Sequence, residues 1–339
     1  MSNLDRSNLP SLEQLKSELL QVTRDRVDLE NAVLSKGTKW PLPNCLTPYQ
    51  IAMVIQAVEH VRCIQCGGKR SMDLLGVYQA TGPDAGLYVT DGDTISRMIR
   101  KYNRDLTERQ IANIEAILRE NIPHVPRCQD RDLIAVNNGL FDYRTKTLHG
   151  FSPDKVYLAK CRVDYRPAPM LPTIRNDADG SDWDVETWVS ELSDDPEIVQ
   201  LIWEILGAIV RPYVSWDKAA WFYSKTGSNG KGSLCALMRN LCGKESCASI
   251  ALANFGEKFM LEPLIRSTAI VVDENDVGIF IDRVANLKGH DERYSSANEK
   301  GCHYTGQKSG AGYPSQQIFY HSAAGGPAPA VTGGLRMAR

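Results

Sequence analysis

Residues 219–233 read AAWFYSKTGSNGKGS, and residues 234–241 continue as LCALMRNL. The sequence starts with an apolar run typical of a short buried strand, passes through a glycine-rich stretch, and ends with the apolar spacing of a helix. A strand, a glycine loop and a helix in this order are the signature of a loop that binds phosphate groups. The stretch therefore predicts an α/β domain built around a phosphate-binding loop.

The residue types of this loop suit the chemistry of phosphate binding. Glycine lets backbone N–H groups turn toward an anion, and the following helix adds about half a positive charge at its N-terminus. We predict that Lys231 reaches the β and γ phosphates of a nucleotide and that Ser233 supplies a hydroxyl to Mg²⁺. The predicted nucleotide-binding residues are Gly227, Ser228, Asn229, Gly230, Lys231, Gly232 and Ser233.

The loop departs from the usual GxxxxGK[ST] pattern at two positions. Lys225 stands where the first glycine is expected, and Gly232 delays the hydroxyl by one residue. The late hydroxyl is tolerated in some phosphate-loop families, whereas Lys225 would either crowd the turn or add a cation beside the phosphates. The alternative interpretation is a glycine turn before a helix, with a solvated lysine.

A second motif follows at residues 269–274, which read AIVVDE. Four apolar residues followed by two carboxylates indicate a buried strand that presents its acids at its C-terminal edge, where phosphates bind in such sheets. Asp273 would hold Mg²⁺, and Glu274 would polarise the attacking water. Taken alone the pair is more typical of a solvated strand end, but the loop upstream favours the catalytic interpretation.

These motifs resemble the phage and plasmid primase-helicase family, within the superfamily 3 helicases. The likeness rests on GSNGKGS at 227–233, NFGEKFMLEPL at 254–264 and AIVVDEND at 269–276. Upstream, residues 133–167, which read LIAVNNGLFDYRTKTLHGFSPDKVYLAKCRVDYRP, resemble the poxvirus-primase-like module that precedes the motor. The likeness extends from about Leu74 to Lys288.

The resemblance implies an AAA-like P-loop NTPase domain preceded by a smaller α+β module. It further implies ATP and Mg²⁺ as cofactors, single-stranded or forked DNA as partner, a hexameric ring, and the cytoplasm of a bacterial host. By the same resemblance Lys231 and Ser233 carry the loop roles, and Asp273 and Glu274 carry the metal and water roles. Two alternatives stay open: a different P-loop NTPase or kinase, and a noncatalytic prophage remnant that binds nucleotide or joins intact subunits.

Beyond Lys288 the family pattern stops. The expected DNA-contacting loop, sensor asparagine and arginine finger are not recognisable, and Arg336 and Arg339 lie in unpatterned sequence. The change suggests truncation or a shifted reading frame, so we expect ATP to bind better than it is hydrolysed. Residues 1–70 offer no paired carboxylates on strands for primer synthesis, so only the helicase part is inferred.

Composition shifts along the chain predict five regions. In residues 289–339 the only large branched aliphatics are Ile318, Val331 and Leu335, so this tail has too little to bury and is expected to be largely disordered. The predicted regions are a helical region at 1–70, the α+β module at 71–166, a linker at 167–180, the partial P-loop domain at 181–288 and the tail at 289–339.

The upstream regions show regular periodicities. Ser11 and Gln14 have the spacing of a capping box, ahead of a heptad stripe that ends at Leu34 and would either pack on the body or mediate association. Further predicted helices are Tyr49–Val61, Ile95–Tyr102, Glu108–Glu120, Trp183–Leu192 and Glu197–Arg211. Predicted strands are Leu74–Tyr78, Gly86–Thr90 and Leu133–Val136, with a hairpin at Arg144–Lys146.

Composition limits the remaining possibilities. With 42% hydrophobic residues and a net charge of −2, the chain is typical of a soluble protein, and any DNA contact needs a local basic surface. We expect no secretory signal and no membrane span. Nine scattered cysteines favour reduced thiols.

Two weaker signals remain open at this stage. His60, Cys63 and Cys66, with Cys45 as a fourth ligand, form half of a zinc-knuckle pattern, and ordinary residues at a helix end are the favoured alternative. Basic residues suited to a DNA backbone, which solvated helix faces explain as well, are Lys69, Arg70, Arg97, Arg100, Lys101 and Arg104.

Overall fold

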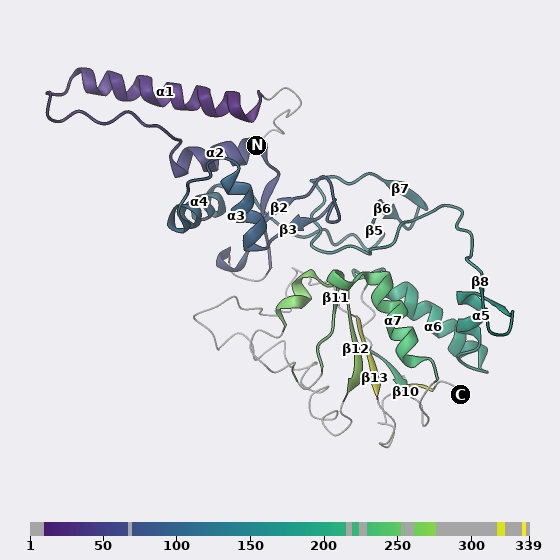
Figure 1. The fold of residues 1–339 in the computed structure, drawn as a ribbon. Helices are drawn as coiled ribbons and strands as arrows, with labels where there is room; N and C mark the ends of the chain where they lie inside the picture. The colour runs from purple at the N-terminus through teal and green to yellow at the C-terminus, as the bar shows by residue number, and fades with distance from the viewer. Residues whose placement is uncertain are drawn as a thin grey trace. The chain divides into compact units, whose positions relative to one another are not determined.

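The structure, a computed structural model, describes residues 10–66, 70–214, 219–223, 229–251, 254, 261–275, 317–322 and 334–336 (Figure 1). It is a mixed α/β protein with small sheets. The chain forms two compact units. Unit 1 comprises Met1–Gln65, Asp73–Gln79 and Tyr88–Pro126, and unit 2 comprises Cys66–Met72, Ala80–Leu87 and Arg127–Arg339.

Three helices of unit 1 begin at capping boxes. Helix α1 (Leu12–Ala32) starts after Ser11, whose Oγ accepts the backbone N–H of Gln14 at 3.2 Å while Gln14 Oε1 accepts that of Ser11 at 2.9 Å. Helices α2 (Pro48–Val58) and α4 (Glu108–Asn121) begin in the same way after Thr47 and Thr107. Each box satisfies two N–H groups that have no partner inside the helix, which explains why sequence spacing located the α1 start correctly.

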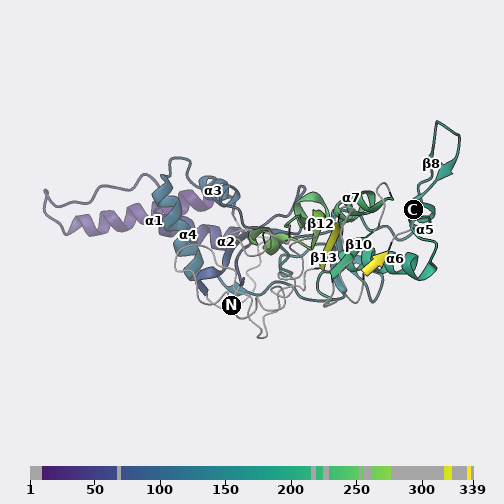
Figure 2. The same ribbon diagram turned by 90° about the horizontal axis from the view of Figure 1, so that it is seen from below.

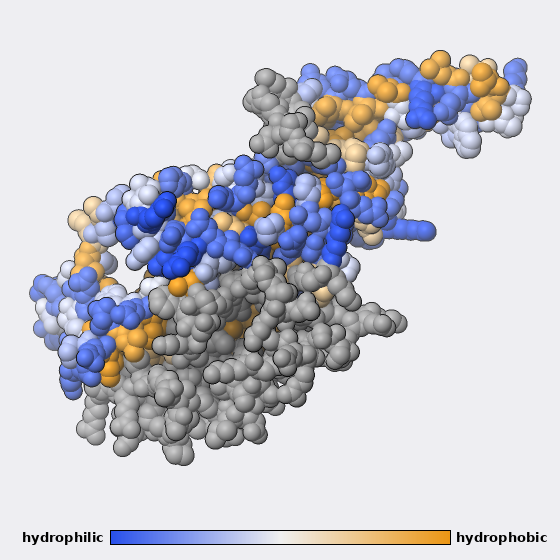
Figure 3. Space-filling view, turned by 180° about the vertical axis from the view of Figure 1, so that it is seen from behind, coloured by the Kyte–Doolittle hydropathy of each residue, from blue (hydrophilic) through white to orange (hydrophobic). Residues whose placement is uncertain are grey.

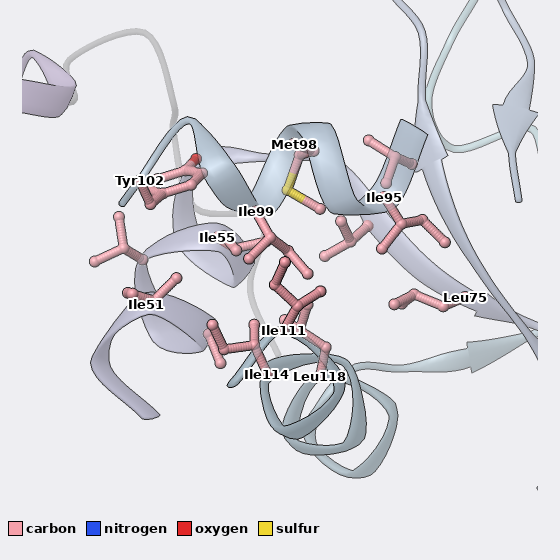
Figure 4. Packing of buried hydrophobic residues seen from close by; sticks show 14 of the residues in the cluster. Ile51, Ile55, Leu75, Ile95, Met98, Ile99, Tyr102, Ile111, Ile114 and Leu118 are labelled. Carbon is pink, nitrogen blue, oxygen red and sulfur yellow. The ribbon is translucent and has the colours of Figure 1, made fainter. Parts of the chain in front are cut away.

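Unit 1 is built on a four-stranded sheet of order β3-β2-β1-β4. Strand β1 (Val61–Ile64) pairs antiparallel with β2 (Leu74–Tyr78) and parallel with β4 (His124–Val125), and β3 (Tyr88–Val89) pairs antiparallel with β2. With α2, α4 and α3 (Gly92–Arg100) the sheet encloses an apolar core. Its fully buried members include Ile51, Ile55, Ile99, Ile114 and Leu118 (Figure 4).

The apolar stripe of α1 is only half used by this core. Leu12 and Leu19 pack against the core, whereas Leu29 and Val33 near the end of the helix are 74% and 86% exposed. Apolar side chains are visible on α1 in Figure 3. The expectation that the stripe packs on the body is therefore confirmed for its first half alone.

Unit 2 begins with short antiparallel strands. Strands β5 (Leu133–Val136), β6 (Gly139–Asp142) and β7 (Thr147–His149) form a sheet, with the predicted hairpin turn between β6 and β7. A small hairpin of β8 (Ile174–Arg175) and β9 (Asp182–Trp183) occupies much of the predicted linker. Helix α5 (Val185–Ser190) starts later than predicted, because Asp184 caps it by accepting the N–H of Thr187 at 2.8 Å.

The second half of unit 2 contains a parallel five-stranded sheet of order β11-β12-β13-β10-β14. Figure 2 shows its strands β12, β13 and β10 from below. Its strands are β10 (Ala219–Tyr223), β11 (Cys247–Ala248), β12 (Ala269–Asn275), β13 (Gln317–Ser322) and β14 (Gly334–Arg336). Helices α6 (Pro196–Ile209) and α7 (Lys231–Cys242) pack on each other, and α7 packs on β12 and β13. Short 3-10 turns lie at Arg70–Met72, Lys244–Ser246 and Glu262–Arg266.

The structure groups the chain differently from the predicted regions at two places. Strand β1, which precedes residue 70, pairs with β2, which follows it, and both belong to unit 1. The stretch 71–166 contributes to both units, with Asp73–Gln79 and Tyr88–Pro126 in unit 1 and Ala80–Leu87 and the residues from Arg127 on in unit 2. In the predicted disordered tail, β13 and β14 belong to the sheet because their backbones pair with β10 and β12. The other residues of 289–339 lie outside the described residues.

The core of unit 1 can be tested with a matched pair of substitutions. Ile114→Ala removes a fully buried side chain, so we expect a loss of about 2–5 kcal/mol in the free energy of unfolding. Leu29→Ala, at an exposed position of α1, should change it by no more than about 0.5 kcal/mol. Urea unfolding followed by circular dichroism measures both, and equal effects would contradict the described core.

Candidate functional site

The first turn of α7 begins at a residue that has to be glycine. Gly230 has a φ of 80°, a left-handed conformation that side chains with a Cβ rarely adopt. A Cβ at this position would lie 2.6 Å from Cδ2 of Leu192, which is closer than atoms pack. The carbonyl of Gly230 accepts the N–H of Leu234 at 2.9 Å, so the turn leads directly into the helix.

Lys231 is buried at the first position of α7. Lys231 is only 5% exposed, and its Nζ donates a hydrogen bond to Oδ1 of the buried Asn229. Removal from water lowers the pKa of Lys231, because burial disfavours the charged form. The first turn of α7 contains no acidic residue, and a helix N-terminus already carries partial positive charge. The electrostatics of this turn therefore favour an incoming anion.

Gly232 and Ser233, which follow Lys231, lie on the exposed side of the first turn of α7. Gly232 and Ser233 are exposed, and a Cβ added at Gly232 would meet no atom of the described residues within 4 Å. Ser233 thus presents its hydroxyl at the surface of the turn. Gly227 and Ser228, like Lys225, lie outside the described residues.

The acidic end of β12 lies at the same edge of the sheet as the end of β10. Trp221 of β10 and Val272 of β12 both pair with Tyr320 of β13, so the three strands are level at this point. Two positions further along β13, Ser322 pairs with Asn275, the last residue of β12, and β10 ends at Tyr223. Since neighbouring strands lie about 4.8 Å apart, the two strand ends are separated by about 10 Å.

The backbone of β12 is irregular where the two acids occur. The register between β12 and β13 shifts between Val272 and Asn275, the interval that contains Asp273 and Glu274. Such irregularities change the direction in which side chains leave a strand and are common beside functional sites. The backbones of Asp273 and Glu274 are thus at the carboxyl edge that the sequence analysis predicted.

Packing fixes α7 against this edge. Leu234, Cys235 and Met238 of α7 are fully buried in a cluster with Phe222 of β10 and Val271 of β12. The helix therefore cannot slide along the sheet without opening the core. Lys231 and the ends of β10 and β12 are held together by the same apolar contacts.

The predicted half zinc site has a different structure. Cys63 is in β1, where its Sγ donates to the carbonyl of Arg119 at 3.8 Å, and His60 makes an edge contact with the ring of Tyr78. Cys63 is thus a strand residue, whereas His60 lies between the end of α2 and the start of β1 and Cys66 follows β1. Across the described part of the chain, His, Cys, Asp and Glu form no cluster of three or more that could hold a metal ion.

The basic residues of α3 are partly neutralised. Arg100 pairs with Glu108 at 2.5 Å, and Lys101 lies 4.0 Å from Glu59. Arg97 is exposed and donates to groups of its own helix. Lys69 lies outside the described residues.

None of the described helices has the length and apolar content needed to cross a bilayer.

Comparison with known families concerns the part of the chain that precedes β10. Residues 76–211 match the family described as D5 N terminal like. No curated protein matches the chain. The D5-like segment runs from β2 through α6, so it spans parts of both units. It supports the predicted primase-type N-terminal module.

Some polar contacts were not anticipated from the sequence. Asn229 was predicted as a nucleotide-binding residue of the loop, and its side chain also accepts a hydrogen bond from Lys231. In unit 1, Nδ1 of His124 lies 2.5 Å from Oδ2 of the buried Asp73, and Arg119 donates to the Asp73 carbonyl at 2.8 Å. The sequence gives no signal for these contacts. Some of the partners are far apart in the sequence, and the others belong to no recognisable motif.

The turn that starts α7 can be tested by two alanine substitutions. Gly230→Ala forces a Cβ into a left-handed residue and against Leu192, so we expect a loss of more than about 1 kcal/mol in the free energy of unfolding. Gly232→Ala, in open space inside the helix, should increase stability by up to about 1 kcal/mol. Thermal and urea unfolding measure the change in the free energy of unfolding for each variant. Changes of the same sign in the two variants would contradict the left-handed turn at Gly230.

Proposed function

We propose that unit 2 binds Mg-ATP at the start of α7 and that the protein is an ATP-driven motor acting on DNA during replication. One observation carries the proposal: a buried lysine stands on the positive end of a helix, at the sheet edge where a second strand ends in two acids. Phosphate groups would neutralise this arrangement better than any other common ligand. The D5-like segment upstream supports replication as the context.

Each residue of the site has a role that its position can serve. Lys231 would exchange its bond with Asn229 for the β and γ phosphates, whose charge would offset the desolvation of the ammonium group. The free N–H groups of the first α7 turn would bind the same phosphates. Glu274 would orient the attacking water and accept its proton.

The donor set fits Mg²⁺. Ser233 offers a hydroxyl oxygen and Asp273 a carboxylate oxygen, which are the ligand types that this ion prefers. When bound, Mg²⁺ neutralises the negative charge that develops on the phosphate oxygens. The sheet order also supports the proposal, since β13 lies between β10 and β12 and leaves about 10 Å for the phosphates and the ion.

Two other functions are compatible with a phosphate-binding loop that contains Lys231. A P-loop kinase would use the same loop but would transfer phosphate to a small molecule, with no response to DNA. A noncatalytic nucleotide-binding protein would keep the role of Lys231 without turnover. The D5-like segment favours the DNA motor over the kinase.

Binding depends on Lys231 if the proposal is correct. We expect Lys231→Ala to weaken Mg-ATP binding by about tenfold to a hundredfold, because one charge-assisted contact to phosphate is lost. Lys244→Ala, which changes an exposed lysine beyond the end of α7, is the matched control and should bind as the unaltered protein does. Isothermal titration calorimetry measures the Mg-ATP affinity of both variants. Unchanged binding by Lys231→Ala would contradict the assignment of the site.

Turnover separates the motor from the alternatives. We expect ATP hydrolysis that single-stranded DNA stimulates, and a fall of about 10²–10⁴ in kcat for Glu274→Gln with ATP binding preserved. Phosphate release with and without DNA measures both. A rate of ATP turnover that does not change with DNA and that requires a small-molecule phosphate acceptor would indicate the kinase. ATP binding without turnover would indicate the noncatalytic protein.

A further inference from the structure

Two cations flank one exposed aromatic ring at the turn between β6 and β7. Nζ of Lys146 lies 3.3 Å from the centroid of the Tyr143 ring, and Cζ of Arg211 lies 3.9 Å from it. Two like charges so near one centroid cannot share a face, so they cover opposite faces of the ring. We call Arg211, Tyr143 and Lys146 the Tyr143 stack.

The two cations are held differently. The side chain of Arg211 is 16% exposed, and its guanidinium donates to Oδ1 of Asp132 at 3.1 Å and to the carbonyl of Arg131 at 3.2 Å. The inner face of Tyr143 is therefore fixed. Lys146 is exposed at the end of the turn, and Tyr143 itself is 41% exposed. The outer face is thus covered by a long side chain that water can reach.

The nearest carboxylate of the turn is already engaged. Oδ1 of Asp142 accepts the backbone N–H groups of Arg144 at 2.8 Å and Thr145 at 3.1 Å, and these bonds lower the pKa of Asp142. The hydroxyl of Tyr165 donates to the carbonyl of Lys146 at 3.3 Å and ties down the end of the turn. A rigid turn therefore presents the exposed side chains of Arg144 and Lys146.

The strengths of the competing contacts decide what this surface can bind. An exposed contact between an ammonium group and an aromatic ring is weaker than the stacking of a nucleic-acid base on such a ring. A base can therefore displace Lys146 from the outer face of Tyr143. The released ammonium group is then free to contact a phosphate on the same strand.

We propose that the Tyr143 stack is a contact site for single-stranded DNA, with one base on the outer face of Tyr143 and backbone phosphates on Lys146 and Arg144. The choice of DNA rests on the proposed function; the choice of a single strand rests on the ring. In a duplex the bases remain stacked inside, so Tyr143 would have no partner. All residues of the site lie within the D5-like segment.

The test is fluorescence anisotropy of a labelled oligo-dT single strand with the full chain and no nucleotide. We expect Tyr143→Ala to weaken binding about tenfold, through loss of base stacking, and Tyr143→Phe to bind as the unaltered protein does. Lys146→Ala should reduce the slope of log affinity against log salt by about 0.7, the value for one phosphate contact on a single strand. Lys244→Ala is the matched control, and its affinity and slope should not change.

Several results would overturn the proposal. Tyr143→Ala with unchanged affinity would exclude the ring, and Tyr143→Phe as weak as Tyr143→Ala would assign the effect to the hydroxyl. Equal competition by a duplex of the same length would exclude the single-strand assignment. Lys146→Ala, which removes only an exposed side chain, tests the phosphate contact even if Tyr143→Ala fails to fold. Lys231→Ala should keep its DNA affinity, so failure at the Tyr143 stack is distinguishable from failure at the ATP site.

Discussion

The burial of one positive charge at the start of α7 is the constraint on which the architecture of unit 2 depends. Lys231 is held in a place that excludes water, on a helix end that is itself positive and has no acid in its first turn. Such a position costs stability unless an anion offsets it. The left-handed Gly230 and the bond from Lys231 to Asn229 keep the charge in place.

The parallel sheet provides the second half of the same arrangement. Because β13 pairs with both β10 and β12, the ends of these two strands are level, and the acids of β12 follow the edge from which the loop before α7 departs. The apolar contacts of α7 with Phe222 and Val271 make this geometry rigid. The proposed phosphate and metal site would benefit from such rigidity, since its groups would keep their positions as charges change.

Within unit 2, the D5-like segment contacts the part of the chain that forms α7 and the parallel sheet. The guanidinium of Arg127 donates to the carbonyl of Ile265 at 3.1 Å, and Arg162 packs over Gly243, the residue that ends α7. A DNA contact at the Tyr143 stack would thus lie in the same compact unit as the start of α7.

The sequence alone determined the elements whose signals are local. The capping box of α1, the start of α7 after Gly230 and the apolar run before Asp273 were all readable, because each depends on residues within a few positions of one another. The extents of β1 and β4, the place of β13 between β10 and β12, and the pairing across residue 70 were decided by the tertiary structure. The Tyr143 stack also emerged only there, because Arg211 reaches the ring from far along the chain. Strand partners and long-range side-chain contacts depend on which surfaces meet after folding, and no spacing along the chain encodes that choice.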